Sequence, residues 1–389
     1  METNTLKKSV LFVLLITVVV SGISQGLLMP VISIIFEQQG ISPTISGFHS
    51  SAFYIGILIA SPFMEMVIRK FGFKNVILVG LTITFISNLL FVVFESIFIW
   101  FLLRLLIGIG ANMCALASQT WITSTVGQKQ RGLIISIYGL CFGLGFAIGP
   151  YATSLIEYNE NLPFLILACL SITVFIIVLF LENRHSIQYD EQVNFRLMDF
   201  FTRFKLVLNY AWVALLFPFT YGVLESVINV NLPTQVLRSN LDLTLISVLV
   251  SVFALGSILF QIPLGIMSDR FGRRKILAIA TAIGTISFVV GVIFFNNIIL
   301  LISMLCIAGM FVGSIYSLGI AYMIDLIPKQ LIPMGTVLSG IVFSFGSILG
   351  PIIGGGLLET IPHFNVLWIF IVLLLFISIV LAKGFQKAM

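Results

Sequence analysis

The fold of this chain is decided by a stretch at residues 265–274, GIMSDRFGRR, which puts a dense group of charges after an apolar segment. Residues 243–266 before it carry no charged side chain. The whole chain shows this contrast, since 59% of its residues are hydrophobic, 9% are charged, and the mean hydropathy is +1.16. A soluble domain has about 25% charged residues. This chain therefore has too little polar surface for water and is expected to lie in lipid.

Long apolar segments recur along the chain, and a membrane-spanning helix needs about 20 such residues. A β-barrel would instead show short segments of alternating hydrophobicity. The first segment follows Lys7 and Lys8, but it is too long for a signal peptide and lacks a cleavage site, so we expect it to be retained. We predict an all-α integral membrane protein with twelve transmembrane helices, at residues 9–36, 45–68, 75–94, 98–124, 132–156, 163–181, 210–236, 243–267, 276–295, 297–324, 334–358 and 364–382.

The basic residues alternate between the two sides of these predicted helices. With the N-terminus inside, inner segments hold 18 of the 20 basic residues, leaving Arg238 outside and Arg104 within a span. Outer loops carry acidic residues instead. Cytoplasmic loops of membrane proteins have this excess of Lys and Arg. We therefore expect a multi-pass protein of the cell (cytoplasmic) membrane with both termini in the cytoplasm, and we interpret the net charge of +5 as topology and attraction to anionic lipid, not as nucleic-acid binding.

The two halves of the chain resemble each other. Three short features recur at an offset of 200 or 201 residues in equivalent predicted helices. They are Gly145, Gly149 and Pro150 with Gly346, Gly350 and Pro351; Phe71 and Gly72 with Phe271 and Gly272; and Gly108 with Gly309. We predict an N-terminal six-helix bundle over residues 1–181, a cytoplasmic central loop with an amphipathic helix over 182–209, and a C-terminal six-helix bundle over 210–389.

Short motifs at these positions resemble those of the major facilitator superfamily (MFS), in its 12-helix bacterial type. The loop after the eighth span resembles the family's loop motif at Gly265, Asp269, Arg270, Gly272, Arg273 and Arg274. The fourth span resembles the family's motif for that span at Arg104, Gly108, Gly110 and Ala111. The fifth and eleventh spans carry the glycine–proline motifs given above. The resemblance implies two parallel six-helix repeats with a cavity at the midplane, and transport by rocking of one half against the other.

The resemblance also gives the basic loop a role, as a gating latch made and released between access states. Asp269 can pair with arginine and accept hydrogen bonds there. The first half departs from the pattern, because Glu65 stands in place of Gly265 and Arg69 in place of Asp269. We therefore expect gating to be asymmetric, and Glu65 is a possible substitute one helical turn earlier.

Charge within the membrane is costly, by about 2.5–3.5 kcal/mol on insertion scales, and so marks candidate functional residues. Arg104 and Glu225 are the two deep candidates for proton coupling. Arg104 begins a stripe of small or polar residues, and Glu225 shares a helical face with Tyr221 and Asn229. Acidic residues in the seventh span occur in proton-coupled multidrug exporters of the family that the chain resembles. The alternatives are a structural arginine bound to backbone carbonyls and a permanently protonated carboxyl that joins helices.

Polar residues in spans that line the cavity of that fold are candidates for binding substrate. Interhelical hydrogen bonding is the alternative for each of them. These substrate-cavity candidates are Gln25, Asn112, Gln119, Tyr138, Tyr221, Asn229 and Tyr316. The glycine–proline motifs should act in helix packing. The fifth-span version accompanies export in the family, but here it is truncated after Pro150, which weakens that inference.

Other classes of protein find little support in the sequence. The pattern Gly22-Ile-Ser24-Gln-Gly26 fits a hydrolase motif but has no preceding strand. The four cysteines all lie in predicted spans, no metal-ligand spacing is present, and no phosphate-binding loop exists. We expect no enzyme activity, no cofactor and no metal.

We therefore predict a secondary active transporter, proton-coupled through Glu225 with Arg104 as a second candidate, that moves a small molecule by alternating access. Efflux of amphipathic compounds by antiport is favoured by the sparse aromatic cavity. Uptake of a small solute by proton symport is one alternative, and a non-transporting sensor or scaffold on the same fold is another. The expected partners are a small-molecule substrate, protons and membrane lipid, and we expect a monomer that binds no nucleic acid.

Overall fold

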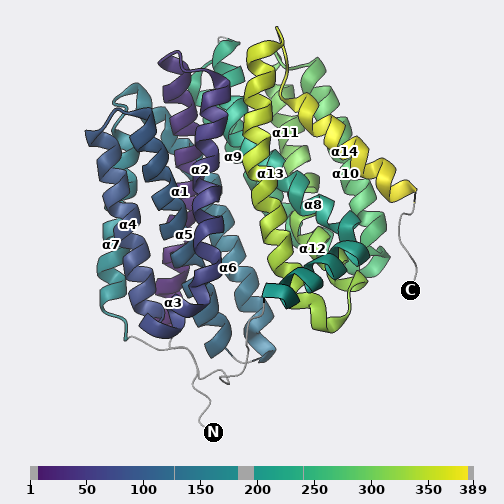
Figure 1. Cartoon of the computed structure of the whole chain (residues 1–389). Coiled ribbons are helices and arrows are strands. Elements are labelled where there is room, and N and C mark those ends of the chain that lie inside the picture. Colours follow the sequence, from purple (N-terminus) through teal and green to yellow (C-terminus); the bar gives the residue numbers. More distant parts are fainter. Residues whose placement is uncertain (1–7, 127, 183–196, 240, 384–389) are drawn as a thin grey trace. The chain divides into compact units, whose positions relative to one another are not determined.

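The computed structural model describes residues 8–126, 128–182, 197–239 and 241–383, and every regular element in these ranges is a helix (Figure 1). Within them, eleven helical segments are long and apolar enough to cross a membrane. A twelfth, α14 (Leu367–Ala382), is equally apolar but has 16 residues. At 1.5 Å per residue α14 is about 24 Å long, somewhat less than the hydrocarbon layer of about 30 Å. The prediction of an all-α integral membrane fold with twelve spans is confirmed.

The first half contains six spans in nine helical elements. Their bounds are α1 Lys8–Gln38, α2 Pro43–Ala60, η1 Ser61–Phe63, α3 Met64–Phe71, α4 Phe73–Val93, α5 Ile97–Thr125, α6 Gln128–Ile148, η2 Gly149–Glu157 and α7 Leu162–Leu179. The second half has α8 Leu197–Arg238, α9 Leu243–Phe271, α10 Arg273–Ile293, α11 Ile298–Val312, α12 Ile315–Leu326, η3 Lys329–Leu331, α13 Ile332–Thr360 and α14.

Proline and glycine explain where the expected helices are interrupted. The second span changes to a 3-10 turn at Ser61, next to Pro62, and the fifth does so at Gly149, next to Pro150. Proline lacks a backbone N–H and so removes one helical hydrogen bond. The tenth span divides into α11 and α12 around Gly313. Span boundaries otherwise agree with the sequence prediction within a few residues, and the expected break at Asn296 and Asn297 lies between α10 and α11.

The predicted central loop is covered only in part. Residues 183–196 lie outside the described residues, and helix α8 begins at Leu197. Ala211, with φ −135° and ψ 22°, breaks α8 into a first segment and a longer one that reaches Arg238. The second segment corresponds to the predicted seventh span.

The internal repeat is visible along α4 and α10, which have the same length at an offset of 200 residues. Their exposed apolar side chains correspond at three positions: Val79 with Ile279, Ile86 with Ile286, and Val93 with Ile293. Apolar side chains exposed at such intervals on a membrane helix face lipid, so each half presents α4 or α10 to the bilayer in the same rotation.

The helices form two compact units, one of residues 1–35 and 49–190 and the other of residues 36–48 and 191–389. The connection between α1 and α2 therefore packs with the second unit. There, Arg238 donates to both carboxylate oxygens of Glu37 at 2.7 and 3.4 Å and to the Leu358 carbonyl at 3.2 Å. Thr44 donates to Glu359 at 2.5 Å.

Glycines bring the helices of each unit into close backbone contact. A Cβ atom added at Gly145 of α6 would lie 2.2 Å from the Val19 carbonyl oxygen of α1. One added at Gly346 of α13 would lie 2.2 Å from the Phe219 carbonyl oxygen of α8. These are equivalent contacts in the two halves, and close approach through small residues is typical of helix packing in membranes.

Candidate functional site

Among the described residues of the first unit, one cationic side chain is buried. Arg104 lies seven residues into α5, is 2% exposed, and its Nε has no hydrogen-bond partner among the described residues. No described Asp or Glu forms an ion pair with it. Gly108, one turn further along α5, packs against the Phe53 carbonyl of α2, which fixes the distance between the two helices. A buried guanidinium with remaining donor capacity can bind a carboxylate or another anionic group.

Polar side chains from α1 and α2 accompany this arginine. Arg104 interacts electrostatically with Tyr54 and His49, both about 1% exposed. The Tyr54 hydroxyl accepts a hydrogen bond from Gln25 Nε2 at 3.5 Å. His49 contacts the backbone of Ile97 at the start of α5. Four polar side chains from three helices thus gather inside the first unit.

The other candidates of the first unit lie apart from this cluster. Asn112 donates to the Ser61 hydroxyl at 3.2 Å, and Tyr138 donates to the Ala115 carbonyl at 2.9 Å, both between helices. Gln119 is exposed near the end of α5. These contacts correspond to the structural alternative for Asn112 and Tyr138.

The second unit contains a buried carboxyl beside aromatic rings. Glu225 of α8 is 9% exposed and interacts electrostatically with the hydroxyls of Tyr221 and Tyr316. The centroids of these two rings are 5.9 Å apart, and Phe343 of α13 lies 6.1 Å from Tyr221 and 5.3 Å from Tyr316. Ser257 of α9 hydrogen-bonds to the Tyr221 hydroxyl. This aromatic group, made of Tyr221, Tyr316 and Phe343, joins α8, α12 and α13 around one acidic side chain.

Asn229 follows Glu225 on the same face of α8. Its Nδ2 donates to the Glu225 backbone carbonyl at 2.7 Å, and its Oδ1 has no hydrogen-bond partner among the described residues. An unpaired buried amide oxygen costs about 1–3 kcal/mol. Asn229 is therefore able to accept a hydrogen bond from a bound molecule.

The basic loop forms an ionic network in the second unit. Arg273 contacts Asp269 at 3.0 Å and Asp325 of α12 at 2.6 Å. Gly272 has φ 94°, a conformation that favours glycine and turns the chain sharply between α9 and α10. In the first unit Glu65 forms an ion pair with Arg69 within α3, at 2.5 Å. Gly265, Arg270 and Arg274 line or flank the same end of the second unit.

Several members of these clusters were not predicted from the sequence. His49 lies within the predicted span at residues 45–68 but was not among the candidates, and in the structure α2 begins at Pro43 and carries His49 nearly two turns inside. Tyr54, Ser257 and Phe343 carry no charge, and only their contacts distinguish them from other residues of apolar helices. The signal that could have found His49 is an ionisable side chain inside the predicted span at residues 45–68.

The chemistry available in these clusters is binding and proton exchange by single side chains. No group of three His, Cys, Asp or Glu residues able to hold a metal occurs among residues 8–126, 128–182, 197–239 and 241–383. Cys114 is buried and Cys169 exposed, and all four cysteines are free thiols.

Comparison with known proteins agrees with this architecture. The family model for the Major Facilitator Superfamily matches residues 14–234 and 214–387. The MFS-type transporter YfkF of Bacillus subtilis (strain 168) is 43% identical over 377 residues, covering 97% of this chain and 96% of the relative. Multidrug resistance protein 2 of the same organism is 23% identical over 376 residues, covering 93% of this chain and 92% of the relative. Quinolone resistance protein NorA of Staphylococcus aureus (strain MRSA252) is 25% identical over 167 residues, 43% of each chain.

A solved structure has the same fold. The nucleoside transporter NupG superposes with a TM-score of 0.80 and 16% identity, covering 98% of this chain and 100% of NupG. The family model and the relative YfkF each span nearly the whole chain. This chain therefore belongs to the Major Facilitator Superfamily, as an MFS-type membrane transporter.

Proposed function

We propose that this transporter exports amphipathic, aromatic cations in exchange for protons. The observation that carries the proposal is the buried carboxyl of Glu225 beside the aromatic group of Tyr221, Tyr316 and Phe343. Aromatic faces attract cations within about 6 Å of the ring centroid, and a single carboxylate supplies the counter-charge. The same carboxyl can hold either a proton or the cationic substrate, and that competition is the basis of exchange.

Two relatives support the direction of transport. Multidrug resistance protein 2 aligns with nearly the whole chain, and NorA with 43% of it. Their names concern resistance, which export of a toxic compound produces. The basic residues at the ends of α3 and α9 support an inner face at these ends, in a protein of the cytoplasmic membrane with cytoplasmic termini.

Ethidium, an aromatic cation, is a suitable probe for the experiment. Purified protein is reconstituted in liposomes with an acidic lumen, and ethidium is added outside. Proton exit should drive ethidium accumulation in the wild type. Glu225→Gln should abolish the response to the pH gradient and weaken ethidium counterflow, because the amide resembles the protonated carboxyl, which supplies no counter-charge to the cation and exchanges no proton.

Asp242→Asn is the matched control. It removes a carboxylate from the same unit at the exposed start of α9, where the side chain caps no backbone N–H. Its transport should equal that of the wild type. Gradient-driven accumulation by Glu225→Gln would remove Glu225 from the coupling step. Accumulation of ethidium only with an alkaline lumen would show symport instead of exchange.

A further inference from the structure

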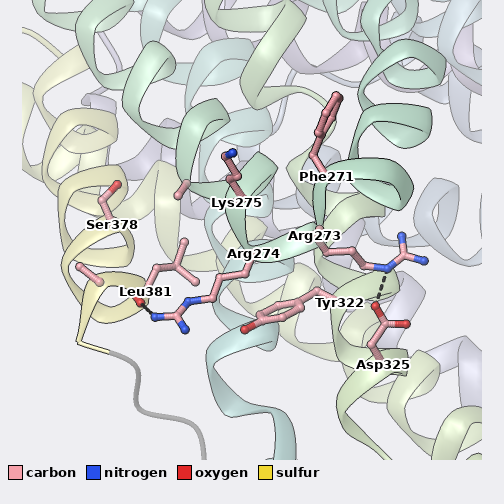
Figure 2. A pocket seen from close by; sticks show the side chains of 11 residues that line it. Phe271, Arg273, Arg274, Lys275, Tyr322, Asp325, Ser378 and Leu381 are labelled. Carbon is pink, nitrogen blue, oxygen red and sulfur yellow. Dashed lines mark hydrogen bonds and ion pairs between the residues drawn. The ribbon is translucent and has the colours of Figure 1, made fainter.

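A pocket opens at the end of the second unit where the basic loop lies. It has a volume of about 590 Å³ and is bounded by the end of α9, the first two turns of α10, α12 and the last turn of α14 (Figure 2). Three consecutive cations, Arg273, Arg274 and Lys275, line it. The pocket takes no part in the exchange proposed above, since Glu225 and the aromatic group are not among its residues.

The three cations differ in what they already bind. Figure 2 shows Arg273 and Arg274 extending to opposite sides of the pocket. Arg273 is neutralised by Asp269 and Asp325. Arg274 donates to the Leu381 carbonyl in the last turn of α14, a neutral partner that leaves its charge uncompensated. Lys275 is exposed and makes no ion pair or hydrogen bond with any described residue. Two positive charges are therefore available to an anion.

The backbone adds to this positive potential. Residues 273–275 form the first turn of α10, whose N–H groups have no partner within the helix. A helix N-terminus carries a partial positive charge and is a ready site for phosphate. The pocket thus combines two side-chain cations with unsatisfied backbone donors.

The exposed face of α10 next to the pocket indicates which kind of molecule bears the anionic group. Lys275 begins a stripe of exposed residues that continues with Ile279, Ala282, Ile286 and Ile293. This stripe is about 27 Å long at 1.5 Å per residue, close to the thickness of the hydrocarbon layer. On α14, Ile379 is 54% exposed beside the lining residue Ser378. Lys275 therefore lies at the edge of the lipid-facing surface, at the depth of the head groups.

We propose that this pocket binds the phosphate of an anionic phospholipid, with Arg274 and Lys275 as its ligands and the acyl chains along the exposed stripe of α10. A free phosphate would bind the same cations but would make no contact with the apolar stripe. The proposal rests on the inner-face orientation given above, since anionic lipid and basic loops meet at the cytoplasmic leaflet.

The internal repeat provides a matched comparison. Lys74, the counterpart of Arg274, donates to the Leu179 carbonyl at the end of α7, at 2.7 Å. The counterpart of Lys275 is Asn75, which has no charge. The first unit therefore keeps the contact between helices but lacks the second cation. Lys275→Asn installs the residue that the first half already tolerates.

Native mass spectrometry of the purified full-length chain tests the proposal by titration with phosphatidylglycerol or phosphatidylcholine of the same acyl composition. The wild type should bind one phosphatidylglycerol more tightly than phosphatidylcholine. Lys275→Asn should weaken phosphatidylglycerol binding about fivefold, the effect of one basic residue near an anionic lipid surface. Lys74→Gln should leave it unchanged.

A competition with inorganic phosphate and a second variant distinguish the remaining outcomes. Inorganic phosphate should fail to displace the lipid at equal concentration; equal competition would show that the pocket binds free phosphate and that the stripe is irrelevant. A Lys275→Gln variant serves if Lys275→Asn is unstable. Equal affinity of wild type and variant for phosphatidylglycerol would overturn the proposal. This assay measures no transport, so its failure is distinct from failure of proton exchange.

Discussion

Replacement of Gly346 by alanine tests how strictly the two long helices of the second unit depend on close contact. The added Cβ would lie 2.2 Å from the Phe219 carbonyl oxygen and 3.0 Å from its carbonyl carbon. Ordinary Cβ contacts are at 3.4 Å or more, so α13 and α8 must separate by about 1 Å along their whole interface. Overpacking of this kind costs about 1–3 kcal/mol.

Gly340→Ala is the control, because the same helix has an open position there with no atom within 4 Å of the added Cβ. Alanine favours a helix over glycine by about 0.8–1 kcal/mol, so Gly340→Ala should be neutral or slightly stabilising. For a domain of 150–250 residues, 1 kcal/mol shifts Tm by about 2–4 °C. Both variants gain this helix propensity, so we expect the Tm of Gly346→Ala to lie about 2–12 °C below that of Gly340→Ala in detergent.

The assay is thermal unfolding of the purified variants, followed by reaction of a thiol-specific dye with the buried Cys114 and the partly buried Cys306. Both variants should give the wild-type chromatographic profile before heating. Equal Tm values for Gly346→Ala and Gly340→Ala would refute the packing argument, since the two differ only in what the added methyl group meets.

Two other changes have defined outcomes. Glu37→Gln and Arg238→Gln, combined in a double-mutant cycle of thermal stability, should give a coupling energy of about 0.2–1 kcal/mol. The ion pair is bidentate, but the Arg238 side chain is 40% exposed, which limits the energy. A value near zero would show that other contacts hold the segment between α1 and α2. Arg104→Met should raise Tm while it reduces transport. It removes a buried cation that costs about 2.5–3.5 kcal/mol to insert into the membrane, and no described carboxylate forms an ion pair with that cation. A lower Tm would identify Arg104 as a structural residue.

The twelve spans were predictable because the thickness of the bilayer fixes the length of an apolar segment and leaves little freedom in its ends. The internal repeat was predictable for a similar reason: α4 and α10 keep the same spacing of lipid-facing residues, and the loops keep their glycines. Hydropathy measures the total polarity of a segment and contains no information about its neighbours. It therefore did not predict the break of α8 at Ala211 or the 3-10 turn that begins at Gly149.

The candidate site was predicted where a charge, or a polar side chain in a cavity-lining span such as Gln25, Tyr221 or Tyr316, marked it. Arg104 and Glu225 were identifiable since an ionised group within a span is rare. His49 was not identified, because it lies only four residues inside the predicted span at residues 45–68, and its burial in α2 shows only in the structure. Phe343 is one of 36 phenylalanines in the chain, and only its contacts with Tyr221 and Tyr316 single it out. The roles of all these residues in transport stay predictions.

The contacts that join the helices at the basic end differ between the two halves. In the second half Arg273 joins α10 to α12 through Asp325, and to α9 through Asp269. The counterparts of these three residues at offsets of 200 and 201 are Phe73, Ser124 and Arg69, so these three positions cannot form the equivalent network.

An aromatic contact takes its place in the first half. Phe73 stacks on Trp121 of α5, with centroids 5.6 Å apart and an interplanar angle of 15°. Both rings are buried, and such a pair contributes about 0.5–1.5 kcal/mol beyond its buried area. The ion pairs of Arg273 are partly exposed and contribute about 0–1 kcal/mol, less at high salt. Phe73 and Trp121 therefore make the contact between α4 and α5 that Arg273 and Asp325 make between α10 and α12. The contact in the second half is sensitive to salt and the one in the first half is not. The asymmetry of gating and the role of Glu65 in it stay predictions.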